Sequence, residues 1–208
     1  MEKFIAGYRQ FRDTYFKENY AFIQDLMAKG QSPKAMMIAC SDSRIDPSLE
    51  FGVGPGEVFI VRNVANLVPA FDPDGHAHGT SAALEFAVRA LEVEHVIVMG
   101  HARCGGIRAL MNQPMMQKSQ ANDFVAAWMK IAEPAREKAL EASSDPVTAQ
   151  RCCEQEAVRI SLENLLTFPW VKEAVESGKL QTHGWYFDLE TATLSILNKQ
   201  TDVFEIIR

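Results

Sequence analysis

Residues 35–47 read AMMIACSDSRIDP, a short apolar run followed by polar side chains at alternate positions. An apolar run of this length is typical of a buried strand. Cys40, Asp42 and Arg44 then carry a thiol, a carboxylate and a guanidinium at its carboxyl end. Because every second residue of an extended chain lies on the same face, the segment predicts a buried strand that ends in a chemically active cluster.

Two further apolar runs predict neighbouring strands. EVFIVRN at 57–63 and HVIVMG at 95–100 are short, and the helical pattern TSAALEFAVRALEV at 80–93 lies between them. Helices that alternate with strands favour right-handed crossovers and a parallel sheet. We therefore predict an α/β fold with a mostly parallel central sheet flanked by helices.

The second half of the chain predicts more helices and a strand hairpin. Residues 119–177 show helical periodicity, interrupted by turn residues. Residues 180–197 predict two strands joined by a turn, and 202–207 predict a last strand or helix.

The N-terminus predicts an amphipathic helix with an aromatic stripe. Phe4, Tyr8, Phe11 and Tyr15 recur at steps of three and four residues. This stripe packs either on the chain's own core or on another subunit. A second helical stretch is expected to end near Met27, before a linker of turn residues.

Composition restricts the class of partner. The chain has 208 residues, 47% of them hydrophobic, and a formal net charge of -6 without any Lys/Arg run. These values predict one globular domain and no partnership with nucleic acid or a membrane, so a small molecule is the expected partner. The first twenty residues lack an uninterrupted apolar stretch, so we expect a cytoplasmic protein.

A second polar cluster, GHARCGG at 100–106, follows the third strand. Because ligands bind at the carboxyl ends of parallel strands, His101 and Cys104 can meet Cys40 there. Two thiolates and one imidazole form the Cys2His set of a catalytic zinc site with an open position. Asp42 either fills that fourth position or stands back from it.

This ligand set indicates a hydrolytic or hydrating mechanism. Zinc lowers the pKa of a bound water from about 15.7 towards about 7. The Asp42 carboxylate can accept a hydrogen bond from the resulting zinc-bound hydroxide and orient it. Arg44 can hold Asp42 off the metal through a bidentate pair.

The motifs together resemble one known family. CSDSR and HARCGG are accompanied by PGEVFIVRNVAN, SAALEFAV, HVIVMGH, SLENLL and HGW, so the likeness covers nearly the whole chain. The sequence resembles the β-class carbonic anhydrases, which interconvert carbon dioxide and bicarbonate. The segment KGQSPK before the first strand is most similar to the plant-type branch.

The resemblance implies a role for each matching residue. Zn²⁺, one per subunit, is expected on Cys40, His101 and Cys104, with Asp42 and Arg44 as the catalytic dyad. Asp42 would be a fourth ligand only in a closed form. The substrate-binding positions are expected to be Gln31, from a neighbouring subunit, the backbone N–H of Gly105, and Phe59 and Val64 as apolar walls.

Family membership also implies a domain plan. The expected β-carbonic anhydrase fold is a single domain, 1–208, in which 1–30 form a helical dimerisation arm. Residues 35–118 would form the zinc-binding core, and 119–208 the helical region and C-terminal strands. Members of the family assemble as dimers or higher even oligomers, which favours the intersubunit reading of the aromatic stripe.

Some positions depart from patterns found within the family. Bacterial members with an inhibitory bicarbonate pocket use a Trp, an Arg and a Tyr, and this chain has Met37, Arg62 and Phe187 there. We therefore predict that the pocket is missing and that Asp42 pairs with Arg44. Phe86 replaces a Tyr, so no proton relay through that hydroxyl is expected.

Two alternatives to carbon dioxide hydration remain open from the sequence. One is hydrolysis of carbonyl sulfide or carbon disulfide on the same scaffold, and the other is a structural zinc module. A structural site normally has four Cys/His ligands, which disfavours the second. The sequence does not indicate the purpose of the bicarbonate, the proton shuttle or the assembly beyond a dimer.

Overall fold

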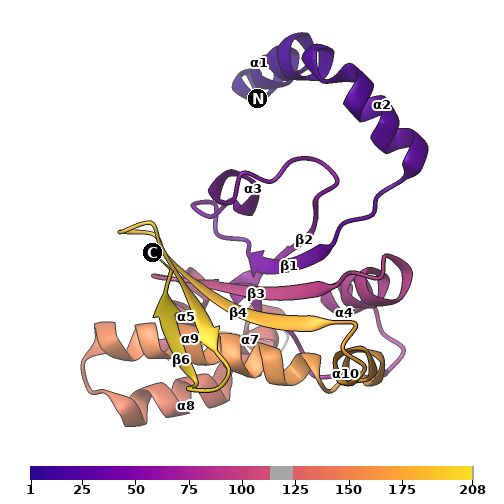
Figure 1. Cartoon of the computed structure of the whole chain (residues 1–208). Coiled ribbons are helices and arrows are strands. Elements are labelled where there is room, and N and C mark those ends of the chain that lie inside the picture. The colour runs from indigo at the N-terminus through magenta and orange to yellow at the C-terminus, as the bar shows by residue number, and fades with distance from the viewer. Residues whose placement is uncertain (113–123, 208) are drawn as a thin grey trace. The chain divides into compact units, whose positions relative to one another are not determined.

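A computed structural model describes residues 1–112 and 124–207 of the chain. By its internal contacts the chain divides into two units, Met1–Ser32 and Pro33–Arg208. The first unit is helical and consists of α1 (Glu2–Phe11), the π-helical segment η1 (Arg12–Phe16) and α2 (Tyr20–Lys29) (Figure 1). None of its three helical segments contains a buried residue.

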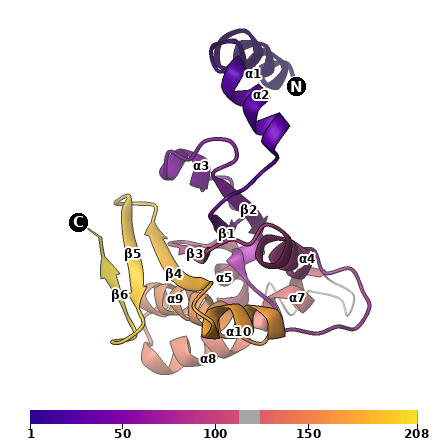
Figure 2. The same ribbon diagram turned by 45° about the vertical axis from the view of Figure 1, so that its right-hand side comes forward.

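The second unit is built on one six-stranded sheet in the order β2-β1-β3-β4-β5-β6. Its strands are β1 (Ala35–Cys40), β2 (Val58–Asn63), β3 (His95–His101), β4 (Gln181–Asp188), β5 (Thr193–Asn198) and β6 (Val203–Ile206). The first four strands are parallel, and β5 and β6 add an antiparallel meander at one edge (Figure 2). This arrangement confirms the predicted α/β class and resolves 202–207 as containing a strand.

Helices connect and cover these strands. Their bounds are α3 (Pro47–Glu50), η2 (Val64–Asn66), α4 (Gly79–Glu85), the π-helical η3 (Phe86–Ala90), α5 (Gly105–Met111), α7 (Phe124–Met129), η4 (Lys130–Ala132), α8 (Glu133–Ala142), α9 (Pro146–Leu165) and α10 (Pro169–Glu176). Figure 1 shows α9 and α10 along one face of the sheet and α3 on the other side of β1 and β2. Among the described residues, no helix combines the length and the apolar character needed to cross a membrane.

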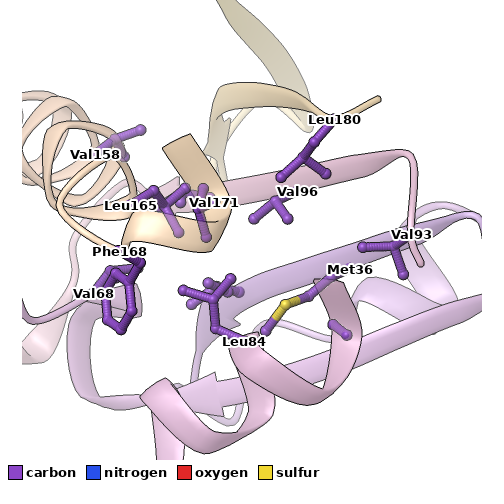
Figure 3. Packing of buried hydrophobic residues seen from close by; sticks show 13 residues of the cluster. Met36, Val68, Leu84, Val93, Val96, Val158, Leu165, Phe168, Val171 and Leu180 are labelled. Atoms are coloured by element: carbon purple, nitrogen blue, oxygen red, sulfur yellow. The ribbon is translucent and has the colours of Figure 1, made fainter. Parts of the chain in front are cut away.

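Strand β1 is buried on both faces because its side chains alternate between two apolar clusters. Met36 and Ile38 pack with residues of α4, α9 and α10, such as Leu84, Leu165 and Val171 (Figure 3). Met37 and Ala39 face the opposite cluster, which includes Ile45. This two-sided burial explains why the strand reads as a continuous apolar run rather than an alternating one.

Helix α9 lies close against the sheet because two strand positions are glycines. A Cβ atom at Gly100 of β3 would be 2.6 Å from Cγ2 of Val158, and one at Gly184 of β4 would be 2.9 Å from Cδ1 of Leu162. Real side chains do not tolerate these separations. The two glycines therefore allow α9 to lie directly against β3 and β4.

Some element boundaries differ from those predicted. The helix predicted over 80–93 changes to π-helical geometry at Phe86 and ends at Ala90, because Glu92 adopts a φ of 52° that no α-helix allows. Helix α2 continues to Lys29, past the predicted end near Met27. The predicted arm, 1–30, falls within the first unit, and the predicted division between 118 and 119 lies outside the described residues.

The close packing of α9 gives a test of the fold. Gly184→Ala would place its Cβ against Leu162, Val158 and Leu197. Overpacking of this kind lowers the free energy of unfolding by about 1–3 kcal/mol, which urea denaturation followed by circular dichroism measures. The matched control is Gly79→Ala on α4, where a Cβ meets nothing within 4 Å, so no loss is expected there. Equal effects of both substitutions would contradict the packing argument.

Candidate metal centre

The sheet topology brings the two predicted clusters to one place. Strands β1 and β3 are parallel neighbours with Ala39 opposite Met99, so Cys40 and His101 both lie at the carboxyl ends. The chain leaving β1 next joins the sheet at β2, on one side, whereas the chain leaving β3 next joins it at β4, on the other. Connections that diverge in this way open a crevice between the two strand ends, which is the usual ligand position in parallel sheets.

A tight turn after β3 directs two donors into this crevice. Arg103 has a φ of 57°, in the left-handed region, and Cys104 follows in an extended conformation as the N-cap of α5. As a result, the side chains of His101 and Cys104 converge with that of Cys40. The possible ligand atoms of these three buried residues all lie within 4.8 Å of one another, and the two sulfur atoms are 3.9 Å apart.

The imidazole of His101 is oriented so that one of its nitrogens is free to bind a cation. The carbonyl of Ala102 lies 2.9 Å from Nδ1 of His101, and since a carbonyl only accepts hydrogen bonds, Nδ1 carries the proton. Nε2 is then a lone-pair donor, and it is buried without a hydrogen-bond partner in the described structure. Such an orphaned imidazole nitrogen beside two thiols fits a Cys2His zinc site.

The two thiols share their protons unequally. Hydrogen bonding from the Cys104 thiol lowers the pKa of Cys40 against the opposing effect of burial, and the N–H of Asp42 also points at the Cys40 sulfur, 3.4 Å away. The same thiol pair raises the pKa of Cys104 far above its ordinary value. Without a cation, the first proton leaves the pair readily and the second does not. A divalent cation would favour loss of both.

Asp42 and Arg44 form a bidentate ion pair beside this group. Nε and Nη2 of Arg44 donate to the two carboxylate oxygens of Asp42 at 2.9 and 2.7 Å. These hydrogen bonds hold the pKa of Asp42 well below its usual value. Arg44 also donates to the carbonyl of Arg103, at 3.0 Å, so one guanidinium connects the loops that follow β1 and β3.

Arg62 of β2 supports the loop that carries the dyad. Its guanidinium donates to the carbonyl oxygens of Cys40, Asp42 and Ile45. Met37 and Phe187, which stand at two positions of the inhibitory pocket, belong to an apolar cluster with Trp185. In this chain the Arg62 guanidinium binds backbone carbonyls. The absence of a bicarbonate pocket stays a prediction.

Of the other predicted site residues, Gly105 and Val64 lie near the three donors, whereas Phe59 does not. Gly105 begins α5 directly after Cys104, and Val64 follows the end of β2, where its carbonyl accepts a 2.8 Å hydrogen bond from Trp128. Phe59 lies four residues before the end of β2, about 13 Å along the strand, and its ring packs 5.9 Å from that of Phe86. Phe59 therefore lies away from the three donors of its own chain. Gln31 belongs to the first unit.

Sequence reasoning missed a buried carboxylate behind Cys104. Glu154 of α9 is 3% exposed and accepts a 2.9 Å hydrogen bond from the backbone N–H of Cys104. Burial raises the pKa of Glu154, and its hydrogen bonds oppose this effect. A signal existed in the sequence, because Glu154 lies in the same helical stripe as Val158 and Leu165, where an apolar residue is expected.

Comparison with known proteins places this geometry in a family. The profile of the carbonic anhydrase family matches residues 35–194, which include all three donors. The chain is 36% identical over 198 residues to beta carbonic anhydrase 3 of Arabidopsis thaliana, covering 94% of this chain and 76% of the relative. The chain belongs to the β-class carbonic anhydrases. It is thus an enzyme of a lyase family, as the motifs predicted.

Solved structures of β-carbonic anhydrases share the fold. The β-carbonic anhydrase CcaA superposes with a TM-score of 0.92 and 29% identity, covering 100% of this chain and 92% of that one. A tetrameric β-carbonic anhydrase of Sordaria macrospora gives a TM-score of 0.81 and 27% identity, covering 95% and 96% of the two chains. These similarities confirm the fold predicted from the sequence.

The contacts of Arg62 predict a local effect on this β-carbonic anhydrase. Arg62→Ala removes a charged donor from three carbonyls, so the free energy of unfolding should fall by about 1–3 kcal/mol. Amide hydrogen exchange should also accelerate in peptides covering residues 40–46. Arg89→Ala is the matched control, because Arg89 pairs only with the Glu85 side chain on the surface among its described contacts. Unchanged exchange in 40–46 would show that Arg62 does not hold this loop.

Proposed function

We propose that this enzyme catalyses the reversible hydration of carbon dioxide to bicarbonate and a proton, with Zn²⁺ held by Cys40, His101 and Cys104. The observation that carries the proposal is the buried group of two thiols and one unpartnered imidazole nitrogen at the sheet's carboxyl edge. Membership of the carbonic anhydrase family supports the choice of reaction.

The residues around the donors have separate tasks in this proposal. When bound, Zn²⁺ lowers the pKa of a water molecule towards neutrality. Asp42 accepts a hydrogen bond from the reacting water and orients it towards the substrate. Arg44 holds both carboxylate oxygens of Asp42, which keeps this carboxylate from closing the metal's open position.

Four further residues complete the proposed substrate site. The backbone N–H of Gly105 and the side chain of Val64 contribute from the same chain as the donors. Gln31 and Phe59 retain the substrate-binding role that the family resemblance implies. We propose that Gln31 comes from a second subunit.

The alternatives from the sequence are less well supported. A structural zinc module would leave the ion pair between Asp42 and Arg44 without a purpose, because such a site needs only ligands that close the coordination shell. Hydrolysis of carbonyl sulfide or carbon disulfide would use the same donors, and no contact among the described residues favours it. A cytoplasmic location stays a prediction from the N-terminal sequence.

Substitution of the donors tests the proposal. Cys40→Ser and His101→Ala should each abolish zinc retention and carbon dioxide hydration, because a serine hydroxyl or a methyl group cannot replace a thiolate or imidazole ligand. Zinc is measured by mass spectrometry of the dialysed protein, and hydration by stopped flow. Cys152→Ser is the control, since Cys152 is a free, part-exposed thiol outside the group of three.

The outcomes separate the alternatives. Full zinc and full activity in Cys40→Ser would refute the ligand assignment. A zinc-loaded wild-type protein without hydration activity would favour the structural module. Steady-state turnover of carbon dioxide, carbonyl sulfide and carbon disulfide by the same preparation distinguishes the remaining reactions.

We also infer that the enzyme self-associates through its N-terminal unit. Phe4, Tyr8 and Phe11 are 74%, 61% and 47% exposed, and α1 buries no residue at all. Contiguous apolar side chains of this kind mark protein contacts. The structure from Sordaria macrospora is described as tetrameric, which supports a second copy of this chain as the partner.

The aromatic stripe gives a prediction on assembly. The double substitution Phe4→Asp and Tyr8→Asp places charge on the stripe, so burial against a second copy becomes unfavourable. Sedimentation velocity should then show a smaller species than the wild type at equal concentration. Gln10→Asp adds charge at an exposed polar position of α1 and should leave the sedimentation unchanged. An unaltered species in the double variant would contradict this role of the stripe.

A further inference from the structure

Glu154 occupies a costly position that the proposed mechanism does not use. Its carboxylate is buried, and no Lys or Arg among the described residues forms an ion pair with it. A buried carboxylate without a cation is unfavourable unless hydrogen bonds replace its lost hydration. Val158 and Leu165 on the same side of α9 are apolar and buried, so a leucine at position 154 would satisfy the packing alone.

Among the described residues, three hydrogen bonds compensate for this burial, and one of them comes from the Cys104 turn. Oε1 accepts from the backbone N–H of Cys104 and from the side-chain amide of Gln150, both at 2.9 Å. Oε2 accepts from the hydroxyl of Tyr186, at 2.8 Å. Tyr186 is itself 1% exposed. Gln150 and Tyr186 therefore fix the carboxylate, and the carboxylate in turn holds the backbone N–H of Cys104.

The backbone N–H of Cys104 has no alternative partner within its own turn. Arg103 is in the left-handed region and Cys104 is extended, so this N–H precedes the helical bonds of α5. Without Glu154 the N–H would be buried and unpaired, and the peptide between Arg103 and Cys104 could rotate. That rotation would swing the Cys104 sulfur relative to His101.

We propose that Glu154 is a positioning residue of the metal centre, whose carboxylate fixes the backbone of Cys104 and thereby the direction of its sulfur. Tyr186 and Gln150 hold the carboxylate in turn. This inference rests on the proposed function, because it assumes that Cys104 binds zinc. Groups that orient metal ligands in this way affect metal affinity although they do not touch the metal.

Zinc release measures this role directly. In the double variant Glu154→Leu/Tyr186→Phe the acceptor is replaced by an apolar side chain of similar volume and the tyrosine hydroxyl is removed with it, so the core stays filled. Transfer of zinc from the folded protein to a chromophoric chelator should accelerate by about 10–100-fold. The absorption bands of the cobalt-substituted protein should shift as well, because they report the ligand geometry.

Conservative variants separate hydrogen bonding from packing. Glu154→Gln keeps an oxygen acceptor for the Cys104 N–H, so its release rate should return most of the way to that of the wild type. Tyr186→Phe alone removes one support of the carboxylate and should give a smaller acceleration than the double variant. It also provides a test if the double variant does not fold.

A control on the same helix excludes a general weakening of α9. Glu156→Gln removes a charge two residues away, where Glu156 pairs with Lys138 and Arg159 rather than with the turn. Its zinc release and cobalt spectrum should match the wild type. A lower unfolding midpoint alone, in any variant, does not support the proposal.

Two results would overturn the inference in different ways. If the folded double variant, or Tyr186→Phe should the double variant not fold, releases zinc at the wild-type rate with an unshifted cobalt spectrum, Glu154 has no positioning role. If the wild-type protein retains neither zinc nor cobalt, the proposed ligand set fails, and this inference fails with it.

Discussion

Four hydrogen bonds converge on the turn that joins β3 to α5, and the whole candidate site depends on it. The N–H of Ala102 donates to the carbonyl of Phe187, and the carbonyl of Ala102 accepts from His101. The carbonyl of Arg103 accepts from Arg44, and the N–H of Cys104 donates to Glu154. A non-glycine residue in the left-handed region costs about 1 kcal/mol, and these bonds keep the turn in that conformation.

The partners of this turn come from separate elements of the second unit. Phe187 belongs to β4, Arg44 to the loop after β1, and Glu154 to α9. The turn is therefore set only when the parallel strands are in register and α9 lies against β3, which Gly100 permits. The geometry of the three donor side chains therefore depends on how the strands and α9 pack together.

The sequence predicted the features that depend on local pattern. The apolar runs became β1, β2 and β3 with small changes at their ends, and Cys40, His101 and Cys104 lie together because strand ends of a parallel sheet meet at one edge. The partner of the Cys104 N–H was not predicted. Glu154 is fifty positions away, and only the docking of α9 decides that a glutamate in an apolar stripe reaches the turn.

Phe59 shows a second limit of local pattern. Motif resemblance assigns it to the substrate site, whereas the strand register places it opposite Met36, far from Cys40 in the same chain. Register is a property of the assembled sheet, so a motif cannot reveal which chain's site a residue serves. Its ring packs instead against that of Phe86, which is 46% exposed.

Two carboxylates near the donors have opposite pKa shifts because their environments differ. Asp42 pairs with Arg44, and this cation favours its ionised form and lowers its pKa. Glu154 has only neutral donors and a buried setting, so its pKa shifts upward. The Asp42 side chain is only partly buried and that of Arg44 is exposed, so a water molecule can reach this ion pair, which suits it to the role we propose for it. Glu154 is buried away from solvent, and its three hydrogen bonds suit it instead to holding the backbone of Cys104 still.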